Sequence, residues 1–409
     1  MTTNPSTFQV TFSTWLKKVA AFSARELEAL VAILSCVIGN PTFRLNRVAK
    51  AATPGFSRNF LATSLMKYAY VQQKLATFIF TEIVTPLPKR LPILLVLDDT
   101  LVKKCGKHIH GAYAWYDHTC GRRVTSLCLV NLALVVNHQL VFVLPWLLRR
   151  PASAQQPGSI SRKDQDAKTL AACELLRIVR SRFKQAGISE KRIVVEADAW
   201  YGNKTFQSAL KQTEGNFRLD ARRNLLVQVP DQAALATRGQ RRRGRTRQKF
   251  VRYLPLTQFL GNSNIWHWFT ARDTGERIYY QMVILTLKTD GKVRVYAFWR
   301  ESCGHPKYIL TRALNHGKPT AQLVYDQYQQ RWSIETAHRD LKQQFGLTKC
   351  QARESWVVSG FIGLIYLGYN LWRVQRWQTQ TSEKKMLKCP SWAEQFYQEQ
   401  IITRIVASS

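Results

Sequence analysis

Carboxylates follow two apolar runs of this sequence, at the point where each run ends. Asp98 and Asp99 come directly after LPILLVL, and Asp198 closes the run RIVVEAD. Where parallel strands end side by side, their side chains emerge at the same edge of a sheet, so distant aspartates converge there. Carboxylate oxygens are the ligands that hard divalent cations prefer. Taken singly, an aspartate after a strand is usually a turn former or a helix cap.

A third acid lies on a helix predicted from about Ala321 to Phe345. In YQQRWSIETAHRDLK, intervals of three, four and seven residues separate the side chains of Tyr328, Arg331, Glu335 and Lys342. These intervals put all four on one helical face. An ordinary amphipathic helix also shows a polar stripe, which explains the periodicity but not the identities of the residues.

The elements that must position these acids follow from the hydrophobic pattern. Apolar runs predict three strands in LPILLVLDDT, VTSLCLVNLALVVN and QLVFVLPWLL. Helical spacing then predicts a helix that stops at Gly187, with apolar positions at Leu170, Leu175, Ile178, Val179 and Phe183. RIVVEAD predicts a buried strand and KTFQSALKQ a second helix. Alternating residues between about Phe217 and Leu310 predict a β-rich insertion.

The pattern Y-x2-R-x3-E-x6-K resembles the signature of DDE transposases in the superfamily of the bacterial insertion sequence "IS-four", over roughly residues 90 to 375. The order of strands and helices also resembles the opening of the ribonuclease H-like fold. The resemblance implies a catalytic, metal-binding triad of Asp99, Asp198 and Glu335. It also implies a site for two Mg2+ ions, with Mn2+ as a substitute, at which Asp99 bridges the two ions. Asp98 stays open as the alternative, because consecutive strand residues point to opposite faces.

The same resemblance implies cleavage at the terminal inverted repeats of a transposon and strand transfer into target DNA, by a homodimer. Phosphate contacts are expected from Arg331 and Lys342, a hydroxyl from Tyr328, and a further contact from His338, which is otherwise an exposed or capping histidine. Related transposases stack a flipped base on an aromatic side chain of the insertion. The candidates are Trp266, Trp268, Trp299 and Tyr308, although tryptophans at alternating strand positions more often pack a core.

The chain is strongly basic. Its 409 residues carry 60 Lys plus Arg against 26 Asp plus Glu, a formal net charge of +34, which predicts a polyanionic partner such as duplex DNA. The densest block lies in residues 221–252 and predicts sequence-neutral phosphate contact or a solvated loop; it includes Arg241, Arg242, Arg243 and Arg245. The longest apolar run, Val124 to Leu148, is interrupted by polar residues and predicts strands, not a membrane span. With no secretory signal in the sequence, we expect a cytoplasmic, nucleoid-associated protein.

The eight cysteines form no C-x-x-C pair, so neither a zinc finger nor a disulfide framework is indicated. One cluster contains only metal-ligating residue types: Cys105, His108, His110, His118 and Cys120. It is either a metal site or a β-hairpin with reduced thiols.

Together these patterns predict an α/β fold, a ribonuclease H-like mixed sheet with a β-rich insertion and an N-terminal helical domain. The expected boundaries are 1–88 for a helical DNA-binding domain, 89–216 and 311–375 for the core, 217–310 for the insertion and 376–409 for a C-terminal helical tail. In the first domain, LNRVAKAATPGFSRNFLATSLMKY resembles a helix-turn-helix, whose segment from Ser57 either reads DNA or packs as in ordinary bundles.

Two other functions fit part of the pattern. A catalytically silent, domesticated DNA-binding protein of the same fold needs no acids, whereas all three acidic positions are present here. An RNA-binding or ribosome-associated protein accounts for the charge but leaves the ordered acids unexplained.

Overall fold

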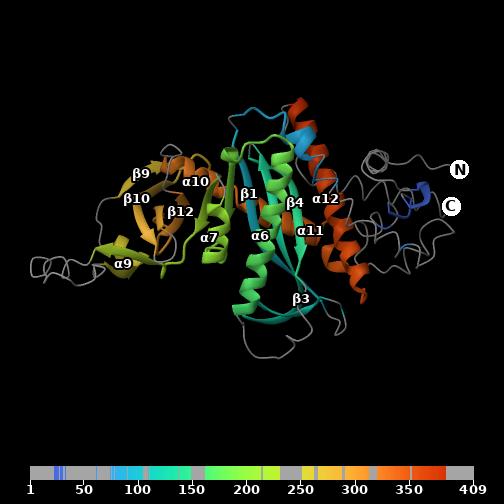
Figure 1. Cartoon of the computed structure of the whole chain (residues 1–409), viewed down its shortest axis with the longest axis horizontal. Coiled ribbons are helices and arrows are strands. Elements are labelled where there is room, and N and C mark those ends of the chain that lie inside the picture. Colours follow the sequence, from blue (N-terminus) through green and yellow to red (C-terminus); the bar gives the residue numbers. More distant parts are fainter. Residues whose placement is uncertain are drawn as a thin grey trace, which may run out of the picture. The chain divides into compact units, whose positions relative to one another are not determined.

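A computed structural model describes residues 79–383 except 90, 105–108, 110, 137, 149–161, 213–214, 231–250, 262–265, 288–290, 313–319 and 351, together with 23–26, 28–30, 33, 61, 74, 76 and 77 (Figure 1). The predicted helix-turn-helix, the arginines from Arg241 to Arg245 and most of the predicted C-terminal tail lie outside the described residues. So do Cys105, His108 and His110.

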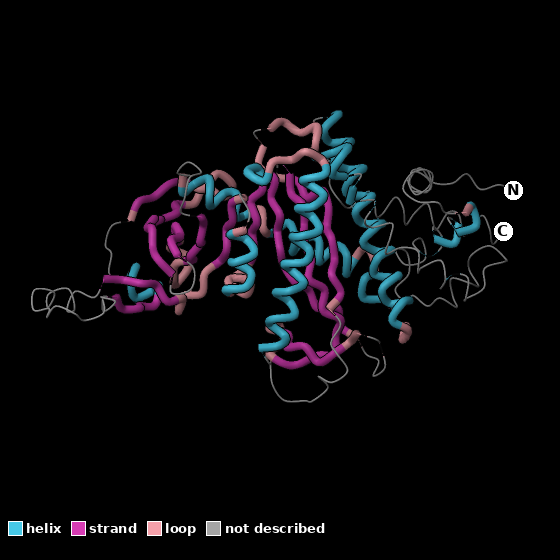
Figure 2. The backbone as a smooth tube through the Cα atoms, viewed as in Figure 1, coloured by secondary structure: helices cyan, strands magenta, loops and turns pink. Residues whose placement is uncertain are grey.

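The chain divides into two compact units. Unit 1 comprises Met1–Leu91, Asp98–Ile188 and Ser333–Ser409, and unit 2 comprises Pro92–Leu97 and Ser189–Trp332. Each unit combines strands with helices (Figure 2), so the fold is mixed α/β, as expected. The division cuts strand β1, Ile93–Lys103, between Leu97 and Asp98. The predicted domain boundaries remain predictions.

Unit 1 is built on a sheet of long, buried strands. β2 (Tyr113–Asp117), β3 (Arg122–Val136) and β4 (Gln139–Leu147) pair antiparallel in chain order, and β1 lies next to β3. Every residue of β3 from Ser126 to Val136 is buried, because helices cover both faces. The strands predicted in VTSLCLVNLALVVN and QLVFVLPWLL are confirmed, and the two pair with each other antiparallel.

Helix α6, Arg162–Gln185, packs against β3 and β4 (Figure 1). Its buried face includes Leu175, Val179 and Phe183, as predicted, whereas Leu170 is 60% exposed, contrary to the expected pattern. The helix ends in a Schellman motif, because Gly187 adopts a positive φ of 68° and the Ile188 amide donates to the Phe183 carbonyl. The π-helical segment η1, Ile79–Val84, packs Phe80 against Phe183 with ring centroids 4.7 Å apart.

Helix α12, Ser355–Glu383, follows the short η5, Leu347–Lys349, and packs on β4. The amide of Asn370 donates to and accepts from the Val143 backbone at 2.9 Å. Within the described part of the chain, α12 alone is long and apolar enough to span a membrane, over Ser355–Val374, but 89% of that stretch is buried. A buried core helix passes the same length and composition test, so this is weak evidence for a span.

Unit 2 extends from the first residues of β1. These pair in parallel with β5 (Ile193–Ala197), which follows η3 (Glu190–Arg192), and β5 pairs in parallel with β6 (Asn216–Asp220). Helix α7, Lys204–Lys211, connects β5 to β6. β12 (Lys307–Arg312) adds to β6 antiparallel and continues the sheet through β11 (Gly291–Trp299) and β10 (Arg277–Leu287). The sheet is therefore mixed, as expected.

The outer strands of unit 2 confirm the β-rich character expected between Phe217 and Leu310. β7 (Leu226–Pro230) pairs with β10 and with β8 (Val251–Pro255), and β9 (His267–Thr270) also pairs with β10. The short helix α9, Leu256–Gly261, follows β8.

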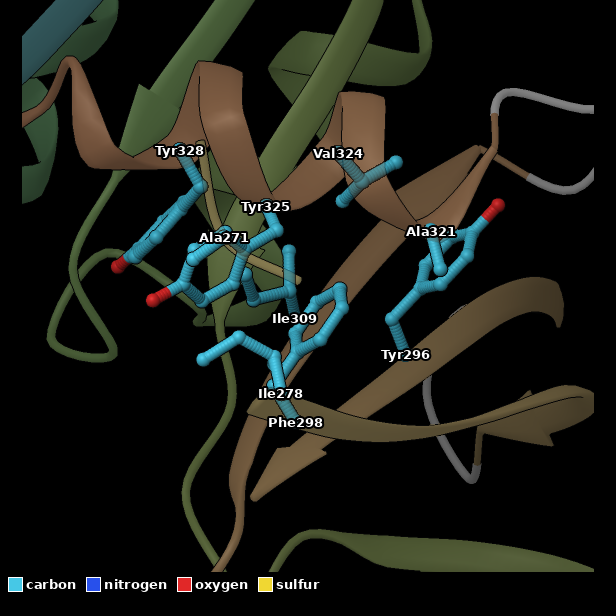
Figure 3. Close-up of a cluster of buried hydrophobic side chains, with 9 residues drawn as sticks. All are labelled: Ala271, Ile278, Tyr296, Phe298, Ile309, Ala321, Val324, Tyr325 and Tyr328. Carbon is cyan, nitrogen blue, oxygen red and sulfur yellow. The ribbon is translucent and has the colours of Figure 1, made fainter. Parts of the chain in front are cut away.

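Helix α10, Ala321–Gln329, packs over this sheet. Figure 3 shows Tyr325 and Tyr328 on α10 beside Ile278 and Phe298 of the strands. Thr320 caps the helix, because its hydroxyl accepts from the Leu323 amide at 3.2 Å.

The continuous helix predicted from Ala321 to Phe345 is wrong. α10 ends at Gln329, and α11 runs from Trp332 to Gln343. At the break, the amides of Gln330 and Arg331 donate to carbonyls three residues back, Gln327 and Tyr328, so the helix tightens and stops. Tyr328 and Arg331 therefore belong to unit 2, whereas Glu335 and Lys342 belong to unit 1, and the four do not share one helix.

Candidate active site

Strand β1 presents its two consecutive aspartates to different neighbours. Asp99 lies beside Lys168 of α6 and Cys128 of β3, whereas Asp98 faces His338 of α11. Strand alternation sends consecutive side chains to opposite faces, so each acid belongs to a different side of the unit 1 sheet. The Asp99 amide also donates to Asp98 Oδ1 at 2.9 Å.

The Asp99 carboxylate is part of a mostly buried ion pair. Lys168 Nζ lies 2.7 Å from Asp99 Oδ2, with side chains 15% and 17% exposed. The same ammonium stands 5.7 Å from the centre of the Trp115 ring, and the Cys128 thiol approaches Asp99 Oδ2 at 3.9 Å. A cation of the protein itself thus compensates this charge.

The other face of β1 meets the polar stripe of α11. Glu335, His338 and Lys342 are spaced by three and four residues, so they share one side of this helix. His338 Nδ1 lies 3.9 Å from Asp98 Oδ2, which brings that side of α11 to Asp98. Burial lowers the pKa of the Lys342 ammonium, against the raising effects of Asp117, Asp98 and Asp99.

The end of β1 is also tied to the segment that follows α11. Lys104 is 5% exposed, and its ammonium donates to the Thr348 carbonyl at 3.2 Å and to the Cys350 carbonyl at 2.7 Å. These bonds satisfy carbonyls at η5 and fix α11 beside the strand that carries the acids.

His338 is not placed to touch DNA, contrary to the expectation from its position on the helix. It is 7% exposed, and its Nε2 lies 2.9 Å from the Asn131 amide nitrogen. The Tyr366 hydroxyl donates to Asn131 Oδ1 at 2.8 Å. Burial, together with Lys342, lowers the pKa of His338 to about 3, so the imidazole is neutral near pH 7.

In unit 2, Asp198 follows β5 in a tight turn. Its Oδ1 accepts from the Trp200 amide at 3.0 Å, the turn-forming role that an aspartate after a strand usually has. The parallel register of β1 and β5 pairs Leu97 with Ala197. The next residue after each partner is an aspartate: Asp98 within β1 and Asp198 in the turn that follows β5.

A buried ion pair lies two residues before Asp198, and the sequence analysis did not single it out. Glu196 is fully buried, and its Oε1 lies 2.9 Å from Arg218 of β6, its register partner. Arg218 also donates to Gln327 of α10. Burial raises the pKa of Glu196 to about 7, against the lowering effects of Arg218 and Arg331. The available signal was an acid inside an apolar run, at Glu196 in RIVVEAD.

Tyr328 is buried as well, which removes it from the expected set of DNA contacts. Its side chain is 4% exposed, and its hydroxyl donates to Asp220 Oδ2 at 3.3 Å. Lys307 stands 3.6 Å from the same carboxylate oxygen and 4.6 Å from the centre of the Tyr328 ring. The guanidinium of Arg331 lies 5.9 Å from that ring and is half-buried.

The four candidate stacking residues differ in exposure. Trp268 is 56% exposed, Trp266 and Trp299 are half-buried, and Tyr308 is 3% exposed, so Tyr308 has no free face for a base. Trp268 and Trp299 are the register partners of Tyr279 on the two sides of β10. These three rings form a row across β9, β10 and β11, and the Arg277 guanidinium lies 4.5 Å from the Trp268 ring.

The predicted triad is divided between the units, with Asp99 and Glu335 in unit 1 and Asp198 in unit 2. Within the described part of the chain, no three His, Cys, Asp or Glu residues form a group that could hold a metal ion. His118 and the exposed thiol of Cys120 are included in that statement. The carboxylates within β1 and directly after β5 nevertheless have the chemistry that Mg2+ prefers.

A family model described as DDE superfamily endonuclease matches residues 45–268, more than half of the chain. No curated protein matches the chain.

Proposed function

Since the chain belongs to the DDE superfamily of endonucleases, we propose that it is a transposase, which cuts DNA at the inverted repeats of a mobile element and joins the ends to target DNA. One observation carries the proposal: Asp98 and Asp198 directly follow Leu97 and Ala197, the last register partners of the parallel strands β1 and β5. Glu335 lies on the side of α11 that faces Asp98. The sequence resemblance to the "IS-four" superfamily supports the same activity.

For the first acid we propose Asp98, the alternative that the sequence left open beside Asp99. Asp98 follows the register partner of Ala197, the residue before Asp198, and lies beside His338 of the helix that carries Glu335. Asp99 points to the other face, where Lys168 neutralises it at 2.7 Å. A carboxylate bound to a lysine ammonium is a poor ligand for a second cation, because the two cations compete for one oxygen.

The proposed cofactor is a pair of Mg2+ ions, with Mn2+ as a substitute, held by Asp98, Asp198 and Glu335. Bound there, the ions supply an activated water and neutralise charge on the leaving oxygen. The protein's part is to orient carboxylate oxygens toward one edge of the sheet. Asp198 does so through the turn at Trp200, whose amide fixes one of its two oxygens.

DNA positioning falls to the half-buried cations. Lys342 of α11 lies near Asp98 of β1. Arg331, which follows α10, lies beside Tyr328. The arginines from Arg241 to Arg245 add phosphate contacts without sequence preference. For a flipped base, Trp268 is the best candidate, because its face is exposed and Arg277 adds a cation beside it.

The proposed partners are transposon ends and target DNA, bound by a homodimer that bridges two ends. For these partners the matching location of the protein is the cytoplasm, in association with the nucleoid. We expect the DNA that flanks the reading frame to carry the substrate, short inverted repeats bracketed by a small direct duplication.

The deciding experiment is Mg2+-dependent cleavage of a duplex that carries such an end. We expect Asp198→Asn to abolish cleavage while it retains DNA binding, and the exposed Asp273→Asn, a matched loss of one carboxylate, to cut like the wild type. Equal cleavage by Asp198→Asn and the wild type would refute the proposed chemistry. Binding without cleavage by the wild-type protein would favour the catalytically silent alternative.

A further inference from the structure

A buried chain of polar side chains in unit 1 ends at Asp98. It links four elements: Tyr366 of α12, Asn131 of β3, His338 of α11 and Asp98 of β1. Tyr366 and Asn131 are fully buried and His338 nearly so. Fully buried polar groups cost free energy unless they are paired, so a connected chain of this kind indicates a specific role.

The neighbours of Asn131 fix the orientation of its amide. The nitrogen lies 3.3 Å from the Leu129 carbonyl, which requires a donor, and the oxygen accepts the Tyr366 hydroxyl at 2.8 Å. The opposite orientation would set the amide oxygen against the Leu129 carbonyl, with no hydrogen between them. The nitrogen therefore also faces His338 Nε2, at 2.9 Å.

This orientation selects one tautomer of His338. An amide nitrogen only donates, so Nε2 must be the acceptor and the imidazole hydrogen must sit on Nδ1. Nδ1 faces Asp98 Oδ2 at 3.9 Å, about 1 Å beyond hydrogen-bond distance. The other Asp98 oxygen already accepts the Asp99 amide at 2.9 Å, so a neighbour stands beside each end of the carboxylate.

We propose that His338 is a positioning residue: its Nδ1–H, set by Asn131 and Tyr366, turns the Asp98 carboxylate for binding a divalent cation. The inference rests on the proposed function of Asp98. His338 neither transfers a proton nor contacts DNA, because its Nε2 lone pair is bound and the ring is buried. The arrangement is the familiar one in which a second residue orients a metal-binding carboxylate.

Two substitutions separate positioning from packing. In His338→Asn the side-chain nitrogen reaches the place of Nδ1 and keeps a donor toward Asp98. In His338→Gln the side chain is closer in size to histidine, but its amide reaches the place of Nε2 and leaves no donor toward Asp98. A packing role therefore predicts that glutamine is tolerated better, and the positioning role predicts the reverse.

The first measurement is Mn2+ binding to the full-length protein without DNA, followed by electron paramagnetic resonance. We expect His338→Asn to bind within about threefold of the wild type and His338→Gln at least about tenfold more weakly, the usual range for loss of an orienting partner. Thermal unfolding of both variants checks that each is folded. Equal Mn2+ affinity of both variants and the wild type would overturn the proposal.

The second measurement is the tautomer of His338, from nitrogen-15 NMR of histidine-labelled protein. We expect the Nδ1–H form in the wild type and in the control Tyr369→Phe, and a mixture of tautomers in Tyr366→Phe, where Asn131 loses its fixed partner. An Nε2–H form in the wild type would overturn the proposal, whatever Mn2+ affinities the variants show. If Asp98→Asn bound Mn2+ like the wild type, the assignment of Asp98 as a ligand would fail, while the tautomer would still test the Tyr366–Asn131–His338 chain.

Discussion

Asp98 and Asp99 are neighbours in the chain but belong to two different chemical environments. On the Asp99 face, Lys168 supplies a full positive charge at 2.7 Å. On the Asp98 face, Asp98 Oδ2 lies 3.9 Å from Nδ1 of His338, an imidazole that burial keeps neutral near pH 7. The Lys168 ammonium competes with a metal ion for the Asp99 oxygen, whereas the neutral His338 ring adds no positive charge beside Asp98. One step along a strand thus separates an ion-paired acid from the acid that we propose as a metal ligand.

The largest expected effect is on catalysis. Asp98→Asn should reduce Mg2+-dependent cleavage by about a thousandfold or more, because a metal-binding carboxylate is lost. Asp99→Asn should cut within about tenfold of the wild type at a temperature where it is folded. End-cleavage assays of the two variants, with DNA binding measured beside them, test this difference. The reverse ranking would return the catalytic assignment to Asp99.

The next largest effect is on the stability of unit 1, and it follows from substitution of Asp99. Asp99→Asn should destabilise unit 1 by about 3–5 kcal/mol, because it leaves the mostly buried Lys168 ammonium without its counter-charge. Asp99→Leu combined with Lys168→Met should recover most of that loss, since no buried charge remains. Urea unfolding of the single and double variants measures this. A double variant no more stable than Asp99→Asn would show that the pair does not stabilise the fold.

A smaller effect concerns pH on the Asp98 face. The pKa of His338 is depressed in the folded state to about 3, so between pH 6.5 and that value the unfolded chain binds the proton preferentially. Stability should therefore fall as the pH drops below 6.5, by about 1.4 kcal/mol per pH unit from this group. His338→Asn does not titrate and should lack this contribution. Denaturation curves at pH 7 and pH 5 compare the two proteins, and parallel losses in both would contradict the burial of a neutral histidine.

The smallest effect expected is that of Cys128, the thiol beside Asp99. Cys128→Ala removes a weak donor and one buried heavy atom, so it should cost about 1 kcal/mol and leave cleavage unchanged. Denaturation and end-cleavage assays measure both. A strong loss of cleavage would mean that the Asp99 face is not merely structural.

Much of the fold was predictable because the strands are buried apolar runs. LPILLVLDDT, QLVFVLPWLL and RIVVEAD all form strands close to the expected bounds. Which aspartate faces α11 was not predictable, because strand alternation gives opposite directions but not which helix covers which face. That information comes from contacts between residues more than two hundred positions apart, such as Asn131 with His338.

The helix break and the buried pair escaped prediction for similar reasons. Neither Gly nor Pro marks Gln330 and Arg331, so local sequence gives no sign that α10 ends there. Glu196 and Arg218 meet only because β5 and β6 pair in a particular register, which depends on the whole sheet. The exposed Leu170 shows the converse error, in which an apolar residue at helical spacing does not reach the core.

The discontinuity of unit 1 has a consequence for synthesis on the ribosome. Strands β1, β3 and β4 emerge early, but α11 and α12, which bring His338, Glu335 and Tyr366, come only after the whole segment 189–332 has been made. At about 5 to 20 residues per second, that segment takes on the order of ten seconds to translate. During that interval the nascent sheet has one uncovered apolar face, and the proposed set of acids stays incomplete until α11 has been made.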